Sequence, residues 1–494
     1  MVSYLEFFQN DFKLVFPEIY ISLSILFLLT MAVFLNTSKK TSIETISWLS
    51  IEVLLITGIL IINNPFYNSL VLSGMVMVDN LTSLVKFIIV ISASIVIFMG
   101  FQYFVDEKIS YFEFGILILL ATLGMMLLIS SYDFIIMYLA IELQSLSLYI
   151  LATLKRDSQF STEAGLKYFI LGALSSGILL FGCSLIYGLT GTTNFESLNH
   201  LLINSAVEYN EISTAISIGI AFIAVALFFK IAAAPFHMWA PDVYEGAPMI
   251  VTAFFAIVPK IAILGLFIEL FLETFYGLVD QWQQIIIFSA MTSMIIGAIG
   301  AIEQKKIKRL LAYSAIGHIG YILIALSSAT VEGIQSLLIY IIIYIIMSIS
   351  IFSIVLSLYK KIDHVRITYI SELTGLAKEN PLLAISLAIT VLSMAGIPPL
   401  AGFASKLYVF YSAIVSSMYV LAIIGVLTSV IAAVYYIRLI KIMYFENNNS
   451  HSYLTMDIQK SLIISSTFLF LVTFLFNPSF LFILTHEITL NFSL

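Results

Sequence analysis

The residues most able to do chemistry are lysines that lie inside apolar sequence. Lys230 follows five apolar residues and precedes Ile-Ala-Ala-Ala, with Pro235 five positions later. Lys260 directly follows Pro259 and comes twelve residues after Pro248. Twelve helical residues span about 18 Å, within a hydrocarbon layer of about 30 Å. Because an ionisable group at such depth costs several kcal/mol, it marks a functional site by default. The two lysines suggest a path for a small cation or a proton.

A carboxyl and a third lysine lie nearby in the sequence. Glu142 is close to the middle of the predicted helix 132–154. At that depth even a structural carboxyl needs a partner, and Lys230 or Lys167 are the obvious candidates. Lys167 lies four residues after Glu163. This spacing is typical of an ordinary surface ion pair, but Lys167 is also about one turn inside its predicted helix. Both interpretations of Lys167 therefore stay open.

Three other polar residues fall within predicted helices. His318, in the predicted helix 307–328, is either a packed, hydrogen-bonded residue or a relay that titrates near working pH. Glu52 lies near the middle of its helix, and we interpret it as a carboxyl hydrogen-bonded to a neighbouring helix. Lys86 is only a few residues into its helix, so we expect it to extend to the membrane interface.

The elements that carry these residues are predicted by composition. Of the 494 residues, 61% are hydrophobic and 10% are charged, and the mean hydropathy is +1.07. Soluble domains have about 25% charged residues, so the sequence predicts an all-α polytopic membrane protein.

The apolar start lacks a basic flank and a small-residue cleavage site, and we expect no cleavable signal peptide. A single cysteine, Cys183, excludes a disulfide framework, an iron–sulfur cluster or a zinc site built from this chain alone. No Gly-x-Gly-x-x-Gly motif or phosphate-binding loop occurs, so we expect any nucleotide chemistry on a partner. We expect no metal site and no cofactor site in this chain.

We expect about fourteen membrane segments, near 17–35, 43–63, 81–103, 112–130, 132–154, 163–189, 212–239, 248–273, 283–301, 307–328, 332–359, 381–414, 417–443 and 461–487. Sixteen of the 22 lysine and arginine residues fall in loops after odd-numbered segments or at the segment ends that border those loops, and none falls in loops after even-numbered ones. Because basic loops stay on the side of synthesis, the odd-numbered loops face the cytoplasm or the mitochondrial matrix. Both termini then face the opposite side.

The segment 381–414 is too long for one straight crossing. Two glycines and two prolines interrupt it, at Gly396, Pro398, Pro399 and Gly402. Lys406 follows in its second half, which repeats the order seen in segment 212–239: apolar helix, proline-marked break, membrane lysine.

Segments four to eight and nine to thirteen form two groups of five, each with its broken helix fourth. Because five is odd, the second group is inverted relative to the first, as in transporter repeats. We expect four parts: an N-terminal three-helix segment (1–110), a first antiporter-like repeat (111–275), a second, inverted repeat (276–445) and a C-terminal transmembrane helix (446–494).

Three motifs point to a known family. They are HMWAPDVYEGAP with the following VTAFFAIVPK, then KRLLAYSAIGHIGY, and SMAGIPPLAGFASK. With these motifs the chain resembles, over essentially its whole length, the antiporter-like membrane subunits of respiratory complex I, NADH:quinone oxidoreductase. It is most similar to the subunit 2 branch (the N subunit in bacteria), because sister subunits usually have a glutamate where Lys406 stands and a histidine where Lys260 stands.

The resemblance implies roles for individual residues. Glu142 and Lys230 are expected to form a charge pair, with Lys167 near it. Lys260 is expected to be the central lysine and Lys406 the exit-side lysine. The flavin (FMN), the iron–sulfur clusters and the quinone are expected on partner subunits, among which are sister antiporter-like subunits. No redox centre is expected in this chain.

These expectations combine into a function. We expect a proton-translocating subunit in which protons move from Lys230 toward Lys260 and Lys406, driven by quinone reduction elsewhere. A cation/proton antiporter subunit is the main alternative, because the same lysines would serve it. A structural subunit that has lost transport is less consistent with the presence of all four charged residues. Nothing indicates nucleic-acid binding.

The composition also bears on location. The chain is rich in Ile, Phe, Tyr and Asn and low in Ala, which is typical of an AT-rich genome such as a mitochondrial one. We therefore expect the mitochondrial inner membrane, with both termini on the intermembrane-space side. A bacterial plasma membrane is the alternative.

Overall fold

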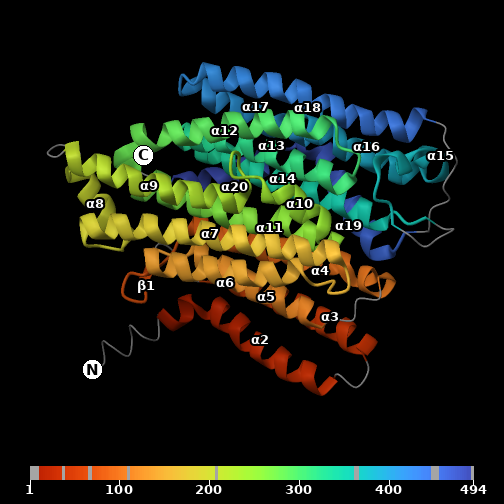
Figure 1. Cartoon of the computed structure of the whole chain (residues 1–494), viewed down its shortest axis with the longest axis horizontal. Helices are drawn as coiled ribbons and strands as arrows, with labels where there is room; N and C mark the ends of the chain where they lie inside the picture. The colour runs from red at the N-terminus through yellow and green to blue at the C-terminus, as the bar shows by residue number, and fades with distance from the viewer. Residues whose placement is uncertain are drawn as a thin grey trace. The chain divides into compact units, whose positions relative to one another are not determined.

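The computed structural model describes residues 11–35, 39–64, 69–107, 112–205, 210–360, 366–446 and 456–490. Nearly all of these residues are helical (Figure 1). The chain divides into two compact units. Unit 1 is Met1–Ile231 with Gly246–Trp282, and unit 2 is Ala232–Glu245 with Gln283–Leu494. The prediction of an all-α polytopic membrane protein is confirmed.

Unit 1 contains α2 (Phe16–Leu35), α3 (Lys39–Ile62), β1 (Ser69–Val71), β2 (Val76–Val78), α4 (Asn80–Asp106), α5 (Glu113–Ile129), α6 (Phe134–Ala152), α7 (Gln159–Thr190), α8 (Phe195–Ser205), α9 (Asn210–Ile231), α11 (Met249–Phe267), a π-helix (Ile268–Thr274) and a 3-10 turn (Tyr276–Leu278). Short loops join α5 to α6 and α6 to α7, so consecutive helices lie side by side (Figure 1).

Unit 2 contains most of α10 (Trp239–Gly246) and α12 (Val279–Ile302), together with α13 (Ile307–Ser327), α14 (Val331–Ser357), a 3-10 turn (Ile370–Leu373), α15 (Leu376–Glu379), α16 (Pro381–Ala395), α17 (Ala401–Val415), α18 (Tyr419–Phe445), α19 (Ile458–Thr473), a 3-10 turn (Phe474–Phe476) and α20 (Ser479–Thr489). Although α10 lies between α9 and α11 in the sequence, residues Ala232–Glu245 belong to unit 2.

Twelve of the described helices are long and apolar enough to cross a membrane. Four shorter apolar helices, α5, α16, α17 and α20, accompany them. The predicted segment 381–414 corresponds to two half-helices, α16 and α17, and the predicted segment 461–487 is divided between α19 and α20. The total of fourteen membrane segments stays a prediction, because each of the four shorter helices has fewer than the roughly 20 residues that one crossing needs.

The two predicted breaks are present, and backbone chemistry explains them. At the end of α16, Gly396 has a φ of 84°, a left-handed conformation that ends a helix and favours glycine. Pro398 and Pro399 follow, and neither has an N–H to continue the ladder. At the end of α9, Ala232 has a φ of 61°, three residues before Pro235. The break after α16 therefore exposes helix-end carbonyls inside unit 2, where a polar side chain can reach them.

Helix α11 is the centre of unit 1, because every residue from Met249 to Phe267 is buried. It packs against α4, α5 and α9. A helix that is apolar on all sides and buried on all sides must sit inside a bundle. Lys260 therefore lies within the protein interior and away from lipid.

One end of unit 1 carries elements that the sequence does not predict. Strands β1 and β2 form an antiparallel hairpin in which Val71 pairs with Val76. Isolated bridges join Val76 to Ser131 and Asp133 to Asn194, which link the hairpin, the loop before α6 and the start of α8. Helix α8 also packs against the π-helix that follows α11. These elements form a cap over one end of the helices, which we call the hairpin end.

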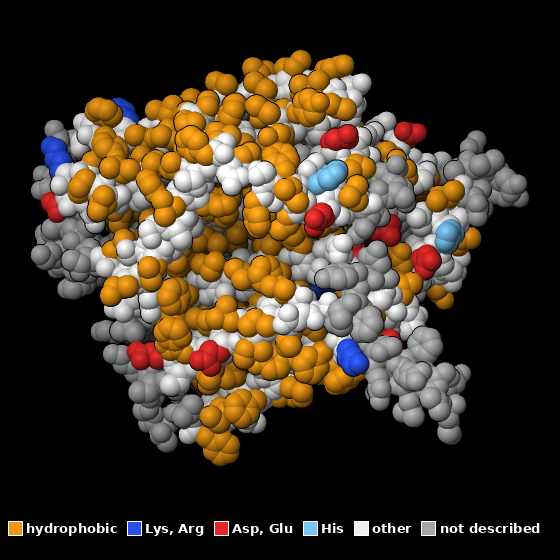
Figure 2. All heavy atoms as spheres, turned by 180° about the vertical axis from the view of Figure 1, so that it is seen from behind, with side chains coloured by type: hydrophobic (Ala, Val, Ile, Leu, Met, Phe, Trp, Pro, Cys, Tyr) orange, Lys and Arg blue, Asp and Glu red, His pale blue; other side chains and the backbone are white. Residues whose placement is uncertain are grey.

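The outer surface is largely apolar. Figure 2 shows hydrophobic side chains over most of one face of the molecule, with few charged side chains among them. Phe34 on α2, Leu174 on α7 and Val430 on α18 are among the exposed apolar residues. Contiguous apolar surface of this extent is typical of contact with lipid or with partner helices.

Candidate functional site

Glu142 and Lys230 lie on neighbouring parts of unit 1. Asp133 caps α6, since its carboxylate accepts a hydrogen bond from the backbone N–H of Ile135, and Glu142 follows in the middle of that helix. Lys230 is buried in the last turn of α9. Among the described ion pairs there is none between these two residues, although the Glu142 carboxyl acts electrostatically on the Lys230 ammonium. The expected charge pair is thus close in space but is not in direct contact.

Hydroxyl groups occupy the space between the two charges. Ser145 Oγ donates to Glu142 Oε2 at 3.4 Å, and Ser145 is also a hydrogen-bonding neighbour of the Tyr149 side chain. Lys230 Nζ donates to Tyr149 Oη at 3.5 Å and to Ser176 Oγ at 3.4 Å. A continuous chain of hydrogen-bonding groups therefore runs from Glu142 through Ser145 and Tyr149 to Lys230.

The position of Tyr149 depends on a glycine of α7. A Cβ atom at Gly172 would lie 2.0 Å from Tyr149 Oη, so any larger residue would push the hydroxyl away. Tyr168 holds the ring from another side, edge-to-face with a centroid distance of 4.8 Å. The sequence contained a signal for this arrangement, because Ser145 and Tyr149 lie three and seven residues after Glu142 and so share its helix face.

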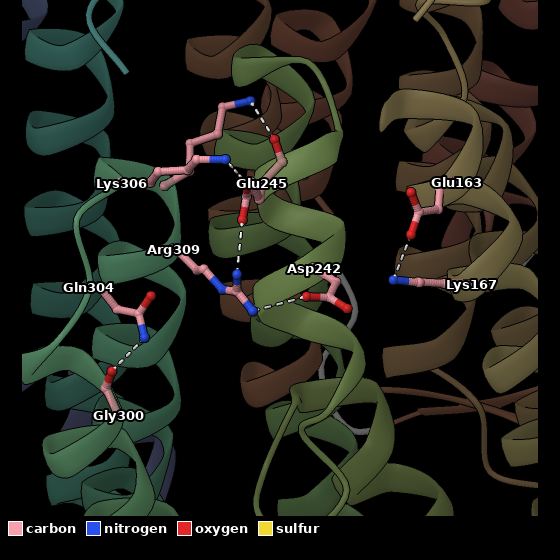
Figure 3. Close-up of polar contacts among 9 residues, drawn as sticks. Glu163, Lys167, Asp242, Glu245, Gly300, Gln304, Lys306 and Arg309 are labelled. Carbon is pink, nitrogen blue, oxygen red and sulfur yellow. Dashed lines mark hydrogen bonds and ion pairs between the residues drawn. The ribbon is translucent and has the colours of Figure 1, made fainter. Parts of the chain in front are cut away.

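Lys167 has a different environment. Its ammonium forms an ion pair with the Glu163 carboxylate (Figure 3), at 2.8 Å. The Lys167 and Glu163 side chains are 43% and 61% exposed. This is the ordinary i,i+4 ion pair that the spacing allows. The neighbours of Lys230 in the hydrogen-bond chain are Tyr149 and Ser176.

Lys260 lies deep in α11 and is 3% exposed. Pro259, just before it, cannot donate a hydrogen bond to the carbonyl one turn earlier, which loosens the helix at this depth. The lysine is thus held inside the most buried helix of unit 1.

In unit 2, Lys406 lies against the break between α16 and α17. Its Nζ donates to the carbonyl oxygens of Met394 at 3.0 Å and Ala395 at 2.9 Å, and it lies 4.9 Å from the centre of the Tyr321 ring. Carbonyls at the end of a helix carry partial negative charge, so the end of α16 is a favourable place for an ammonium group. Gly396 keeps this approach open, because a Cβ there would lie 2.8 Å from the Lys406 side chain.

His318 is fully hydrogen-bonded in the interior of unit 2. Its Nδ1 lies 2.8 Å from Tyr340 Oη and its Nε2 lies 3.3 Å from Tyr436 Oη. Tyr436 Oη in turn shares a hydrogen bond with Ser314 Oγ. The packed, hydrogen-bonded interpretation of His318 is therefore what the geometry shows, and the same hydroxyl partners could also carry a proton.

A small cavity brings His318 and Lys406 together. It measures about 10 Å³, which is space for about one water molecule. Its lining includes His318, Lys406, Tyr436, Ser314 and Tyr321. Lys406 has three N–H donors and uses two on carbonyls, which leaves one for a water in this cavity.

Ion pairs in unit 2 join the motif HMWAPDVYEGAP to the start of the motif KRLLAYSAIGHIGY and the residues just before it. Glu245 of α10 forms an ion pair with Lys306, at the start of α13 (Figure 3). Arg309 Nη2 lies 3.3 Å from Asp242 Oδ1, and Arg309 Nη1 lies 3.4 Å from Glu245 Oε2. The sequence did not indicate this network, because the partners are more than sixty residues apart.

Two expectations about the N-terminal helices are wrong. Lys86 does not extend to the interface: its ammonium is buried and lies 2.7 Å from the Glu18 carboxylate. The first turn of α2 brings that carboxylate to α4, so the charge is neutralised inside the protein. Glu52 is exposed on α3 and is not turned toward a neighbouring helix of this chain.

Comparisons with known proteins bear on this geometry. The family model "NADH:quinone oxidoreductase/Mrp antiporter, TM" matches residues 131–432. NADH-ubiquinone oxidoreductase chain 2 of Marchantia polymorpha is 49% identical over 98% of this chain and 99% of its own length. A chain of respiratory complex I from Thermus thermophilus with bound Aureothin superposes with a TM-score of 0.77 and 25% identity, over 94% of this chain and 98% of that one. A chain of the Mrp complex from Dietzia sp. DQ12-45-1b has a TM-score of 0.82 and 19% identity, over 98% of this chain and 97% of that one, a likeness of fold alone.

Proposed function

Because this chain belongs to the family of NADH-ubiquinone oxidoreductase chain 2, it is a proton-translocating membrane-arm subunit of respiratory complex I, and we propose that titratable residues of its helices carry the protons. The residues are Glu142, Lys230, Lys260, Lys406, Lys167 and His318. The observation that carries this proposal is the chain of hydrogen-bonding groups that joins Glu142 to Lys230 inside unit 1.

The first step concerns Glu142 and Lys230. Burial disfavours the charged form of a lysine, and a nearby carboxylate offsets this cost. When Glu142 is ionised, Lys230 keeps its proton. When Glu142 loses its charge or moves away, Lys230 releases the proton, and Tyr149 or Ser176 is the first acceptor in reach. Water then carries the proton toward Lys260.

The second step concerns Lys406 and His318. A water in the cavity between them accepts a hydrogen bond from the Lys406 ammonium and passes a proton toward the Tyr436 hydroxyl and His318. The carbonyl groups at the end of α16 stabilise Lys406 while it is charged.

Among the six proposed proton carriers, Lys167 has the least structural support, because its ammonium is already paired with Glu163 at the surface.

The energy comes from partner subunits. The chain is a subunit of NADH-ubiquinone oxidoreductase, and the flavin, iron–sulfur clusters and quinone belong to other subunits, so this chain itself holds no redox centre. Quinone reduction changes the charge next to this subunit, and the change is passed to Glu142 electrostatically. Sister antiporter-like subunits are the expected neighbours in the membrane arm.

The experiment replaces Lys230. In the assembled complex, Lys230→Ala is expected to lower the number of protons translocated per NADH, since the proton released next to Glu142 has no carrier. The measurement is the ratio of proton uptake to NADH oxidation in sealed vesicles. Lys441→Ala is the matched control, because Lys441 is an exposed lysine of α18. A Lys230→Ala complex that assembles normally and pumps at the native ratio would contradict the proposal.

A cation/proton antiporter subunit is the second candidate, and the similarity to the Mrp complex favours considering it. A native gel of gently solubilised membranes separates the two. Complex I would migrate as a very large band that oxidises NADH and contains flavin. A smaller band without flavin, with sodium or potassium exchange in vesicles, would support the antiporter.

We place the chain in the mitochondrial inner membrane, with the bacterial plasma membrane as the alternative, and both termini in the intermembrane space. The support is the composition and the accumulation of basic residues in odd-numbered loops. An epitope tag at the C-terminus should be accessible to antibody in mitochondria whose outer membrane alone has been opened. Accessibility only after both membranes are opened would reverse the orientation.

A further inference from the structure

The hairpin end of unit 1 contains a buried carboxyl that the proposed proton path does not use. Glu269 lies in the π-helix Ile268–Thr274, which continues α11, and it is 5% exposed. Within the described part of the chain, the Glu269 side chain has no hydrogen bond and no ion pair. An isolated ionised carboxylate is very costly to bury, so an unpartnered one is expected to be neutral.

The charged groups that act on Glu269 are mostly acidic. They are Asp79, Glu273 and Lys86. Lys86 is already engaged by the Glu18 carboxylate at 2.7 Å. Asp79 accepts a hydrogen bond from the backbone N–H of Thr82 at 2.7 Å, which holds it at the start of α4. Lys86 is the cation among these neighbours, and because it is already paired with Glu18 it does not neutralise Glu269.

The balance of charge favours a bound proton. Glu18 already offsets the charge of Lys86, so Asp79, Glu269 and Glu273 are three carboxyls without a further cation among the groups that act on Glu269. Carboxylates that share a buried site cannot all ionise, because each charge raises the cost of the next. These carboxyls do not converge as ligands of a metal ion, since no group of three or more potential ligands occurs among the described residues. A proton is therefore the ligand that this site fits.

A route leads from Glu269 toward water. Glu273 lies four residues further along the π-helix and is half-buried, and its Oε1 accepts a hydrogen bond from Tyr132 Oη at 3.3 Å. Glu196, in the first turn of α8, is exposed and acts electrostatically on both Tyr132 and Glu273. Exposure thus rises in order from Glu269 through Glu273 to Glu196.

We propose that Glu269 is a proton-binding residue and that Glu269, Glu273 and Tyr132 form a proton port at the hairpin end of unit 1. The Glu269 carboxylic acid gives its proton to the Glu273 carboxylate, directly or through water, and Glu273 releases it to water beside Glu196. Glu269 is then an anion until a proton from the interior of unit 1 restores the acid. Lys260 lies nine residues earlier along the same helix. The role of the port rests on the proposed proton translocation, whereas the bound proton does not.

The port also joins two parts of the chain. Glu269, Glu273 and Tyr132 lie within the matched family region 131–432, whereas Glu18, Asp79 and Lys86 lie before it. Helix α4 and the residue just before it thus supply Lys86 and Asp79, which act electrostatically on Glu269, and α2 supplies Glu18, which pairs with Lys86. This gives those helices a role in proton exchange besides packing.

The test replaces Glu269 with glutamine in the assembled complex, since glutamine keeps the shape of a protonated glutamate. Two readouts are measured: the carboxylic-acid C=O band in infrared spectra, and protons translocated per NADH. Glu269→Gln is expected to lose intensity from that band and to lower the ratio while NADH oxidation continues. Glu332→Gln, at an exposed glutamate in the first turn of α14, is the matched control and should change neither.

Each other outcome overturns the proposal. An unchanged infrared band would mean that Glu269 holds no proton. A lost band with a native pumping ratio would remove the port but leave the proposed function intact, which Lys230→Ala tests separately. A band that shifts with sodium concentration would assign the site to a metal cation.

If Glu269→Gln does not assemble, Glu273→Gln replaces it as the test. Glu273→Gln is expected to lower the number of protons translocated per NADH while the infrared band of Glu269 remains. A native number of protons per NADH in Glu273→Gln would also remove the port.

Discussion

Glu142 and Lys230 interact through hydroxyl groups and not through a contact ion pair. Coulomb energy falls with distance, so a separated pair costs less to open than a contact pair. Tyr149 Oη, 3.5 Å from Lys230 Nζ, is the group that fills the gap. Lys406 differs, because helix-end carbonyls hold its ammonium in place of a carboxylate. The two lysines are thus stabilised by different means, and their sensitivity to substitution should differ accordingly.

At the scale of single residues, we predict that Tyr149→Phe uncouples proton translocation. The ring and its contact with Tyr168 remain, so the complex should assemble. Loss of the hydroxyl leaves a Lys230 donor unsatisfied, at a cost of about 1–3 kcal/mol. Protons translocated per NADH should fall while NADH oxidation persists. Tyr411→Phe, at an exposed tyrosine of α17, is the control and should behave as the native complex. Equal ratios in the two variants would exclude a role for the Tyr149 hydroxyl.

At the scale of elements, the break between α16 and α17 determines where Lys406 lies. The start of α17 packs so closely on α16 that a Cβ at Gly402 would lie 1.8 Å from the backbone oxygen of Ser393. Ser393 Oγ also accepts a hydrogen bond from the Gly402 N–H at 3.0 Å. The next residues of α16, Met394 and Ala395, provide the carbonyls that bind Lys406. Close packing at Gly402 therefore sets the geometry of the ammonium site.

Gly402→Ala is accordingly expected to destabilise the complex and to disturb proton translocation. The added methyl group must displace the backbone of α16, and overpacking of this kind costs about 1–3 kcal/mol. The measurement is the thermal unfolding midpoint of the purified complex, together with the proton ratio. Gly177→Ala is the matched control, because a Cβ there meets nothing within 4 Å. A Gly402→Ala complex as stable as the Gly177→Ala complex would show that α16 tolerates the shift.

At the scale of the whole molecule, the two compact units do not correspond to two continuous stretches of the sequence. Residues Ala232–Glu245 belong to unit 2, although the helices on both sides of them belong to unit 1. Ion pairs from Asp242 and Glu245 to Arg309 and Lys306 hold this segment within unit 2. The two inverted repeats that the sequence predicts, 111–275 and 276–445, stay a prediction.

We predict that Arg309→Gln weakens the attachment of α10. The substitution removes the ion pairs to Asp242 and Glu245, and partly exposed pairs contribute up to about 1 kcal/mol each. The unfolding midpoint should fall slightly at low salt, and the difference from the native complex should shrink at high salt, because ions screen exposed charges. Arg438→Gln serves as control, since the Arg438 guanidinium donates to the Ile302 carbonyl and forms no described ion pair. A salt-independent loss would point to packing.

The sequence by itself determined the class of protein and the places where helices break, and it singled out three lysines, Lys230, Lys260 and Lys406, that are buried in the structure. These follow from local chemistry: apolar runs, prolines without an N–H, and charges set within apolar sequence. Tertiary structure alone decided that Tyr149 lies between Glu142 and Lys230, that Lys86 is buried against Glu18, and that the charge of Asp79 acts on the buried Glu269. The physical reason is that such contacts depend on how helices distant in sequence pack. Helical periodicity says which residues share a face, but not which face of another helix they meet.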